Sequence, residues 1–400
     1  MNKRPLAALM ILAALGSTAL VTATQAATPT AASAQSIPAG TAVNEGAVAR
    51  HYGALVFANY SDALAAAKEM QTAIKAFVTA PSAQAMDKAR QAWRDAREFY
   101  GQTEAFRFYG GPIDDENGPE GQINAWPLDE AYVDYVEGKP NAGLINDRKF
   151  TITKANLIKV NERGGEENVS SGWHAIEFLL WGQDLSEKGP GERSFEDYVD
   201  GKKSNADRRR QYLTVATELL IDDLASLVKA WEPGKKNYRA GFEKGGRESV
   251  RKMIVGLGSL SRGELSGERM EVALNSQDQE DEHSCFSDNT HRDAVTNAKG
   301  IQNVWLGQYQ RRDGSKLQGA GLRDLVAGKD APLAEKTTLQ IAESVRLAEA
   351  IPAPFDQAII QGSAGRPVIE KTIASLVEQS KLLVDSASAV GITKLTLVQP

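Results

Sequence analysis

The most informative side chains for chemistry are His174 and Glu177, because no other ionisable side chain occurs in the apolar stretch 172–181 (GWHAIEFLLW). Ser170 or Ser171 can cap the start of a helix over this stretch. A helix that is apolar on every side is typical of a protein core. Residues three apart share one face of a helix, so the imidazole and the carboxylate point in the same direction.

A buried carboxylate is costly unless it is paired, so Glu177 requires a partner. One candidate is a metal cation, for which His174 would provide nitrogen and Glu177 oxygen. Di-iron helical bundles place Glu and His at this same separation on inward-facing helices. The alternative is a buried ion pair or a hydrogen-bonded core histidine, and the spacing alone does not distinguish the two.

A second acidic side chain, Glu104, is expected to face the same core. It lies 11 residues after Trp93, close to three full helical turns, so it continues the stripe formed by Trp93 and Tyr100. Arg97 shares this face, and an Arg97–Glu104 ion pair is the simpler interpretation. An inward carboxylate on a second helix is nevertheless what a metal site between bundle helices needs.

The segment 275–290 (NSQDQEDEHSCFSDNT) concentrates acidic residues around a histidine and a cysteine. Blocks of acids are usually solvated surface, but His283 and Cys285 are of the types that transition metals prefer. The segment is therefore either a wall of the metal site, with Glu282 and His283 close to it, or an exposed loop. Cys285 is the single cysteine of the chain, so no internal disulfide can form.

Common hydrolase and nucleotide-binding motifs are absent from the sequence. Ala175 follows His174, so the HExxH motif of zinc proteases is missing. No G-x-S-x-G or G-x-x-x-x-G-K-[ST] sequence occurs in the required context. The net charge of −6, from 46 basic and 52 acidic residues, provides no basic field, so nucleic acid is not expected as a partner.

Apolar residues recur three or four positions apart through most of the chain, which predicts an all-α fold. The stretch 110–126, rich in Gly, Pro and Asp, predicts a long structured loop. The expected helices cover residues 48–78, 82–109, 128–136, 151–160, 172–181, 208–231, 242–255, 268–281, 293–309, 334–350 and 368–390.

Pro233 and Gly234 interrupt the helical pattern near the middle of the chain. We therefore expect two helical-bundle domains packed together, an N-terminal one over 42–232 that holds the His-x-x-Glu pair and a C-terminal one over 233–400. The similar helical contexts of two tryptophans, one in each half, hint at a pseudo-duplication.

The N-terminus has the three parts of a cleavable secretory signal. A basic start is followed by the apolar stretch 5–21 and then by small residues, and cleavage after Ala26 predicts a signal peptide over 1–26. A flexible leader over 27–41 follows. No later stretch is apolar enough to span a membrane, so the mature protein is expected in the periplasm or exported cell envelope.

Four segments taken together extend the pattern around the histidine. They are 93–104, 124–130, 172–184 and 281–286, and the third contains Gly172-x-His174-x-x-Glu177. In this order they resemble the imelysin family, helical envelope proteins described both as metallopeptidases and as iron-regulated proteins, whose motif is G-x-H-x-x-E. The resemblance extends over nearly all of the chain that follows the signal.

The resemblance implies two helical bundles with a metal site between the halves of the chain. By the family motif, His174 and Glu177 are the first-choice ligands, with Glu104 opposite them. The surrounding wall is expected from Arg97, Asp129, Glu282 and His283.

Two functions suit such a site, and a third is simpler. A binding protein that captures iron and passes it to other envelope iron-uptake proteins, or senses it, is favoured, because mixed nitrogen and oxygen ligands suit iron. The alternative is a zinc metallopeptidase for a peptide substrate, in which Glu104 activates water as the base. The third is a structural envelope protein whose His174–Glu177 pair only joins the two halves.

Overall fold

The computed structural model describes residues 43–186 and 188–398, and helices form almost all of its regular structure. The predicted signal peptide and leader, 1–26 and 27–41, lie outside the described residues. In chain order the helices are α1 (Glu45–Thr79), α2 (Ala83–Tyr100), η1 (Gly101–Phe106), α3 (Glu120–Ile123), α4 (Glu130–Val133), α5 (Lys154–Val160), α6 (Gly172–Trp181), η2 (Phe195–Tyr198), α7 (Ala206–Ala230), α8 (Tyr238–Phe242), α9 (Arg247–Ser259), η3 (Leu260–Glu271), α10 (Val272–Ser276), η4 (Gln279–Asp281), α11 (Thr290–Leu306), α12 (Leu322–Ala327), α13 (Ala331–Glu349), α14 (Phe355–Ile359) and α15 (Arg366–Ala389).

The sheet content of the described residues is one short hairpin. Strands β1 (Gln308–Gln310) and β2 (Lys316–Gln318) pair antiparallel, with Tyr309 opposite Leu317. The prediction of an all-α fold is therefore confirmed.

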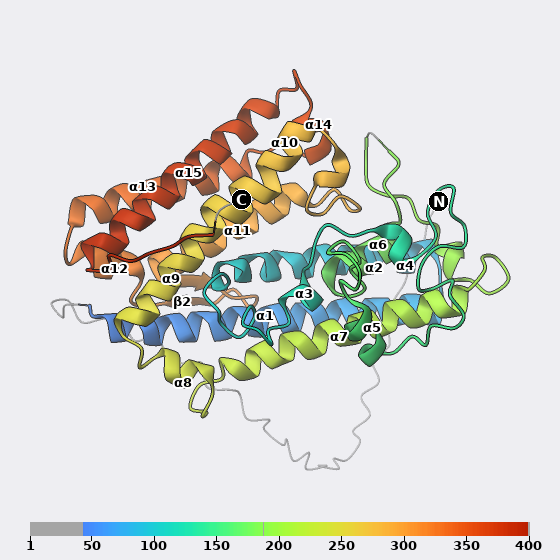
Figure 1. The fold of residues 1–400 in the computed structure, drawn as a ribbon, viewed down its shortest axis with the longest axis horizontal. Helices are drawn as coiled ribbons and strands as arrows, with labels where there is room; N and C mark the ends of the chain where they lie inside the picture. Colours follow the sequence, from blue (N-terminus) through green and yellow to red (C-terminus); the bar gives the residue numbers. More distant parts are fainter. Residues whose placement is uncertain (1–42, 187, 399–400) are drawn as a thin grey trace, which may run out of the picture. The chain divides into compact units, whose positions relative to one another are not determined.

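Helix α1 organises the first half of the chain. Asn44 caps it by accepting a hydrogen bond from the backbone N–H of Ala47. The buried residues of α1, from Val48 to Phe77, pack against α2 and α7, which lie on either side of it in Figure 1. Helix α6 packs in turn against α2 and α7, so the predicted buried helix lies within this group.

Helices α11, α13 and α15 form a second group, drawn in orange to red in Figure 1. Within it α13 packs against both α11 and α15, and α15 also packs against α9 and η3. Helix α11 contacts η1 and α2 from the first half of the chain. These contacts join the two groups at the position where the candidate site lies.

A continuous hydrophobic core connects both halves of the chain, with members from Val48 on α1 to Ile392 beyond α15. Contacts between residues keep the described parts of the chain, 43–186 and 188–398, in one unit. The division into domains 42–232 and 233–400 is therefore not confirmed and stays a prediction, as does the duplication.

Two expected helices change type along their length. The helix expected over 82–109 ends as α2 at Tyr100 and continues as the 3-10 helix η1. Gly101 lies so close to α11 that a Cβ atom there would be 2.0 Å from Thr296 Oγ1. In place of the helix expected over 268–281, the chain forms the π-helix η3, then the short α10 and η4.

The helix expected over 128–136 is limited to the four residues of α4. It ends at Asp134, whose Oδ2 accepts hydrogen bonds from Arg193 Nη1 and Arg209 Nε, both at 2.6 Å. The buried carboxylate is placed for these two guanidinium groups, so the backbone leaves the helical path there.

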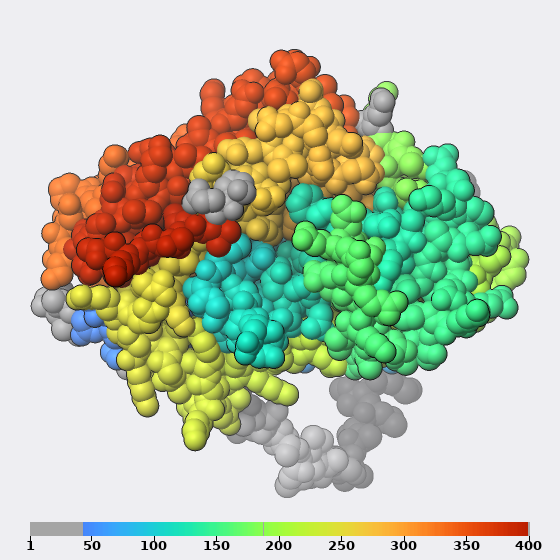
Figure 2. Space-filling model, in the orientation of Figure 1, coloured from blue at the N-terminus to red at the C-terminus, as the bar shows by residue number. Residues whose placement is uncertain are grey.

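The long irregular stretch between α2 and α6 covers one side of the core. Figure 2 shows it as the cyan-to-green surface beside the C-terminal helices. It contains the expected loop over 110–126, within which α3 forms a single helical turn. Among the described residues, no helix is long and apolar enough to cross a membrane.

Candidate metal centre

Helix α6 begins at Gly172, where the fold requires a glycine. The φ of Gly172 is +85°, and a Cβ atom would lie 2.4 Å from the carbonyl oxygen of Ile123. The expected serine cap does not form, because the hydroxyl of Ser171 donates to the carbonyl oxygen of Gln122 at 3.0 Å instead. The first residue of the G-x-H-x-x-E motif thus lets the loop at 122–123 lie against the start of α6.

His174 and Glu177 lie on one face of α6, as predicted, and contact each other directly. Nδ1 of His174 is 2.8 Å from Oε2 of Glu177, and the two residues are 1% and 0% exposed. The other carboxylate oxygen, Oε1, accepts hydrogen bonds from the backbone N–H of Ser287 at 3.0 Å and from its hydroxyl at 2.6 Å. Both oxygens of Glu177 therefore already have partners.

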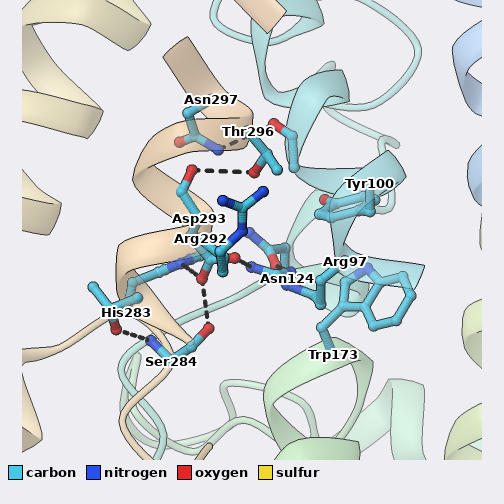
Figure 3. A network of polar contacts seen from close by, with 12 residues as sticks. Arg97, Tyr100, Asn124, Trp173, His283, Ser284, Arg292, Asp293, Thr296 and Asn297 are labelled. Atoms are coloured by element: carbon cyan, nitrogen blue, oxygen red, sulfur yellow. Dashed lines mark hydrogen bonds and ion pairs between the residues drawn. The ribbon is translucent and has the colours of Figure 1, made fainter. Parts of the chain in front are cut away.

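His283 repeats this arrangement from the other half of the chain. Its ring lies 4.7 Å from that of His174, centroid to centroid, and its Nδ1 is 2.7 Å from Oδ2 of Asp293 on α11. The hydroxyl of Ser284 donates to the same oxygen at 2.5 Å (Figure 3). Each of the two neighbouring imidazoles is thus held at Nδ1 by a carboxylate.

The second ring nitrogen of each histidine has no hydrogen-bond partner, although Nε2 of both His174 and His283 is buried. Burial and the nearby Arg97 lower the pKa of His174 well below its usual range. Burial and Arg269 lower the pKa of His283 to about 3. Both rings are therefore neutral at pH 7, and a proton on Nδ1 leaves a lone pair on Nε2.

Arg97 forms the back of the centre instead of pairing with Glu104. Its Nη2 is 3.0 Å from Oδ1 of Asp293, and its Nη1 donates to Oδ1 of Asn124 at 2.7 Å (Figure 3). The guanidinium also lies over the rings of Tyr100 and Trp173, 5.4 and 5.7 Å from their centroids. Arg97 therefore keeps Asp293 ionised and in place for His283.

Glu104 lies in η1 and is 1% exposed. Its Oε2 accepts hydrogen bonds from Arg107 at 2.6 Å and from Arg269 at 2.7 Å, whereas its Oε1 has no partner. Burial alone would raise the pKa of Glu104, but the two guanidinium groups hold it well below its usual range. Glu104 is therefore an ionised acceptor with one unpaired oxygen.

The π-helix η3 positions Arg269, the second of these guanidinium groups. Nη1 of Arg269 donates to Asn297 on α11 at 2.6 Å, and Nη2 donates to both Glu104 and Glu264. π-helical turns occur often at functional sites. Here the turn carries a basic side chain from the second half of the chain onto an acidic one from the first.

The sequence profile of the imelysin family (Peptidase_M75) matches residues 56–383, including every side chain of this centre. The chain belongs to the imelysin family. This match confirms the resemblance carried by the four sequence segments.

Individual imelysin relatives agree with this assignment. Iron-regulated protein A of Synechococcus elongatus is 26% identical over 312 residues, which make up 76% of this chain and 74% of the relative. The solved structure of an iron-regulated protein A precursor from Parabacteroides distasonis has a TM-score of 0.66 at 18% identity. That of an imelysin-like protein from Psychrobacter arcticum has a TM-score of 0.63 at 14% identity. Each structural match covers 88% of this chain and 97% of the chain in the solved structure. At these identities the matches show a shared fold only.

In this imelysin chain, five of the seven residues predicted for the site belong to one network: Arg97, Glu104, His174, Glu177 and His283. Asp129 instead caps α4, with its Oδ1 accepting from the backbone N–H of Ala131. Glu282 is buried next to His283, and the charges that act on its carboxylate come from other acids, not from the histidines.

Besides Oδ1 of Asp293, which is paired with Arg97, three atoms of the centre that can donate an electron pair are buried without a hydrogen-bond partner: Nε2 of His174, Nε2 of His283 and Oε1 of Glu104. Two imidazole nitrogens and one carboxylate oxygen are a donor set typical of transition metals. Carboxylates on Nδ1 orient metal-binding histidines in this way. In the described residues, however, no group of three or more His, Cys, Asp or Glu side chains is placed so that it could hold a metal ion.

Sequence reasoning missed Asp293, Ser287, Asn124 and Arg269. Asp293 follows His283 by ten residues, and the loop between them has no periodicity from which a contact could be predicted. The other three come from irregular segments or from the π-helix. Their types gave no signal, because Ser, Asn and Arg are common throughout the chain.

Proposed function

We propose that this imelysin binds one transition metal ion, with iron favoured, through Nε2 of His174 and Nε2 of His283, with Glu104 as the adjacent oxygen ligand. The observation that carries the proposal is the pair of buried imidazoles whose rings lie 4.7 Å apart and whose Nε2 atoms have no partner. Glu177 and Asp293 would act as positioning residues, since each holds Nδ1 of one histidine.

The charge balance around the centre favours a cation. Five carboxylates lie among three guanidinium groups in this network: Glu104, Glu120, Glu177, Glu264 and Asp293 against Arg97, Arg107 and Arg269. Burial raises the pKa of Glu177 to about 8, although hydrogen bonds from Ser287 oppose the rise. A metal ion on Nε2 of His174 would oppose this rise, because its positive charge favours the ionised carboxylate that accepts the Nδ1 proton.

Iron handling is favoured over peptide cleavage by the state of Glu104. A general base works best with a pKa near the operating pH, but Arg107 and Arg269 hold the pKa of Glu104 well below its usual range. His174, Glu177 and His283 are each at most 1% exposed, so a polypeptide does not reach them in this conformation. Burial of this kind suits an ion that is captured and held. The name of the Synechococcus relative, iron-regulated protein A, agrees with iron as the cargo.

The cell-envelope location is part of the same proposal. The basic start, the apolar stretch and the small residues before position 27 support export to the periplasm. Delivery of the ion to envelope iron-uptake proteins would follow from that location.

Metal titration of the purified mature protein tests the proposal. With Fe²⁺ under anaerobic conditions, and separately with Zn²⁺, the wild type is expected to bind one ion. His174→Ala and His283→Ala should each lose it while their circular dichroism stays helical. His291→Ala is the matched control, because His291 contacts the backbone of Asp288 outside the centre and should leave the stoichiometry unchanged.

Two outcomes would contradict it. Wild-type protein that binds neither ion at micromolar concentration would refute the metal centre. Chelator-sensitive cleavage of peptides by the wild type, lost in His174→Ala, would replace iron handling by the zinc-peptidase function.

A further inference from the structure

A cavity of about 490 Å³ lies next to the histidine centre. Its wall includes Ser287, whose backbone N–H and hydroxyl donate to Oε1 of Glu177 at 3.0 and 2.6 Å. Helix α2 contributes Arg94 to the wall, and the residue before α11 contributes Asn289. Ser287 therefore belongs both to this cavity and to the hydrogen bonds that position His174 through Glu177.

The charged side chains that line the cavity are Arg94, Lys188, Arg292, Asp95, Glu98 and Asp288. Glu98 accepts hydrogen bonds from Arg292 at both carboxylate oxygens, each at 2.7 Å, so these two charges offset each other. Asp95 is exposed, where water and salt screen its charge. Burial raises the pKa of Asp288 to about 7, so about half of its carboxyl groups are neutral at pH 7. Arg94 is therefore left as a partly buried cation in the wall of the cavity.

The guanidinium group of Arg94 has hydrogen-bonding capacity left for a ligand. Its Cζ lies 5.0 Å from the centroid of the Trp181 ring, and its Nη2 donates to the carbonyl oxygen of Ser287 at 3.4 Å. Within the described residues, no carboxylate forms an ion pair with it. An arginine held by an aromatic ring and one long hydrogen bond presents the planar N–H groups that bind a carboxylate through two parallel bonds.

Asn289 offers a second donor to the same cavity. The residue is 4% exposed, and its Nδ2 is buried without a hydrogen-bond partner. Asn289 is the N-cap of the 17-residue helix α11, but its side chain makes no capping hydrogen bond. An acceptor atom in the cavity would satisfy this amide. The N-terminus of the helix also favours a negative charge at this position.

We propose that the cavity binds a small anion with several carboxylate groups, and that iron reaches the histidine centre as the chelate of such an anion. One carboxylate would accept hydrogen bonds from Arg94 and Asn289, and the others would hold the iron, for which carboxylates are common ligands. The volume of the cavity suits a small molecule. Anion binding rests on the cavity alone, whereas the delivery of iron rests on the proposed function.

Calorimetric titration of the metal-free mature protein with citrate tests the anion site, and inorganic phosphate is titrated separately. The wild type should bind citrate more tightly than phosphate. Arg94→Gln removes the guanidinium group, and Asn289→Asp replaces the amide donor by a carboxylate of the same size that still suits an N-cap. Each variant should weaken citrate binding by about 10–100-fold. Lys88→Gln removes a basic charge from an exposed position of α2 outside the cavity and should leave the affinity unchanged.

Iron delivery is measured with the same variants under anaerobic conditions. Free Fe²⁺ should load the wild type and Arg94→Gln equally, whereas Fe²⁺ supplied as its citrate complex should load Arg94→Gln about tenfold more slowly. His174→Ala should still bind citrate although it holds no iron, so the anion site and the metal centre can fail separately. A wild type that takes up iron in neither form would refute the metal centre, and the delivery step with it.

Three results would overturn this inference itself. A wild type that binds no citrate at millimolar concentration, or citrate binding that Arg94→Gln and Asn289→Asp leave unchanged, would remove the anion site. Phosphate bound as tightly as citrate would contradict recognition of several carboxylates. Equal loading of the wild type and Arg94→Gln from the citrate complex would contradict delivery as a chelate.

Discussion

Some polar side chains of the centre have an atom without a hydrogen-bond partner, and other side chains hold these in position. Both oxygens of Glu177 are occupied, by His174 and by Ser287. Glu177 was predicted as a direct ligand from its spacing to His174. The spacing established the shared face, but it could not show that the carboxylate would turn back onto Nδ1 of the same pair.

Glu177→Gln tests the division of roles. An amide keeps the size of the side chain, but its NH₂ group facing Nδ1 would favour a proton on Nε2, the atom proposed to bind the ion. We expect metal affinity to fall by about 10–100-fold, as for other orienting groups, without loss of the stoichiometry. Competition with a calibrated chelator measures this change. Complete loss of the ion, equal to that in His174→Ala, would make Glu177 a ligand.

Asp223 on α7 offers a prediction about stability that is independent of any metal. Its Oδ2 is buried without a partner. Its pKa is raised to about 7, mainly by burial and secondly by the charge of Asp222, and Lys154 opposes this rise more weakly. Because the folded pKa lies above the unfolded one, the wild type should lose stability as the pH rises from about 4 to about 7.

Asp223→Asn removes this ionisation, so we expect it to stabilise the protein by about 1 kcal/mol at pH 8, with no gain below pH 4. Urea unfolding at the two pH values measures the difference. Glu218→Gln, which changes an exposed acid of the same helix that does not act on Asp223, is the control and should not stabilise. An equal effect of Asp223→Asn at both pH values would show that its ionisation is irrelevant.

At the scale of elements, the sequence predicts long helices well and short or unusual ones poorly. Helices α1, α6 and α15 lie within a few residues of their expected bounds, because apolar periodicity marks them in the sequence. Helices η1 and η3 could not be predicted. Their geometry depends on Gly101 against Thr296 and on Arg269 reaching Glu104, contacts between residues far apart in the sequence.

Gly172→Ala tests how α6 is positioned. The new methyl group would meet the carbonyl oxygen of Ile123 at 2.4 Å in a backbone conformation that disfavours alanine. We expect a loss of about 3 kcal/mol or more and weaker metal binding, because the loop that carries Asn124 must shift. Gly201→Ala is the matched control: its φ is +79° but nothing lies within 4 Å, so about 1 kcal/mol is expected. If thermal unfolding shows that both variants lose the same stability, the close approach of Ile123 to Gly172 is contradicted.

At the scale of the whole molecule, the all-α class was predictable and the assembly of the centre was not. Residues from both sides of position 232 build it: Glu104 and His174 come from one side, and Arg269, His283 and Asp293 from the other. Periodicity identifies which residues are buried, but not which buried faces meet. The family resemblance implied a site shared by the two halves, and the network of contacts agrees with it.

Processing of the N-terminus is a prediction for the whole chain. If residues 1–26 are a signal peptide, protein isolated from the soluble envelope fraction should begin at or near Ala27. Mass spectrometry of the intact protein determines this. Material that retains Met1 and remains in the cytoplasmic fraction would contradict export.

The position of a bound iron ion tests the central claim most directly. Crystals of the wild-type protein grown with iron can be measured by anomalous diffraction on both sides of the iron absorption edge. We predict a single dominant peak within bonding distance of Nε2 of His174 and Nε2 of His283, next to Oε1 of Glu104, with Glu177 still bonded to Nδ1. No peak at this position, or an ion held by Glu177 in place of Nε2, would contradict the account.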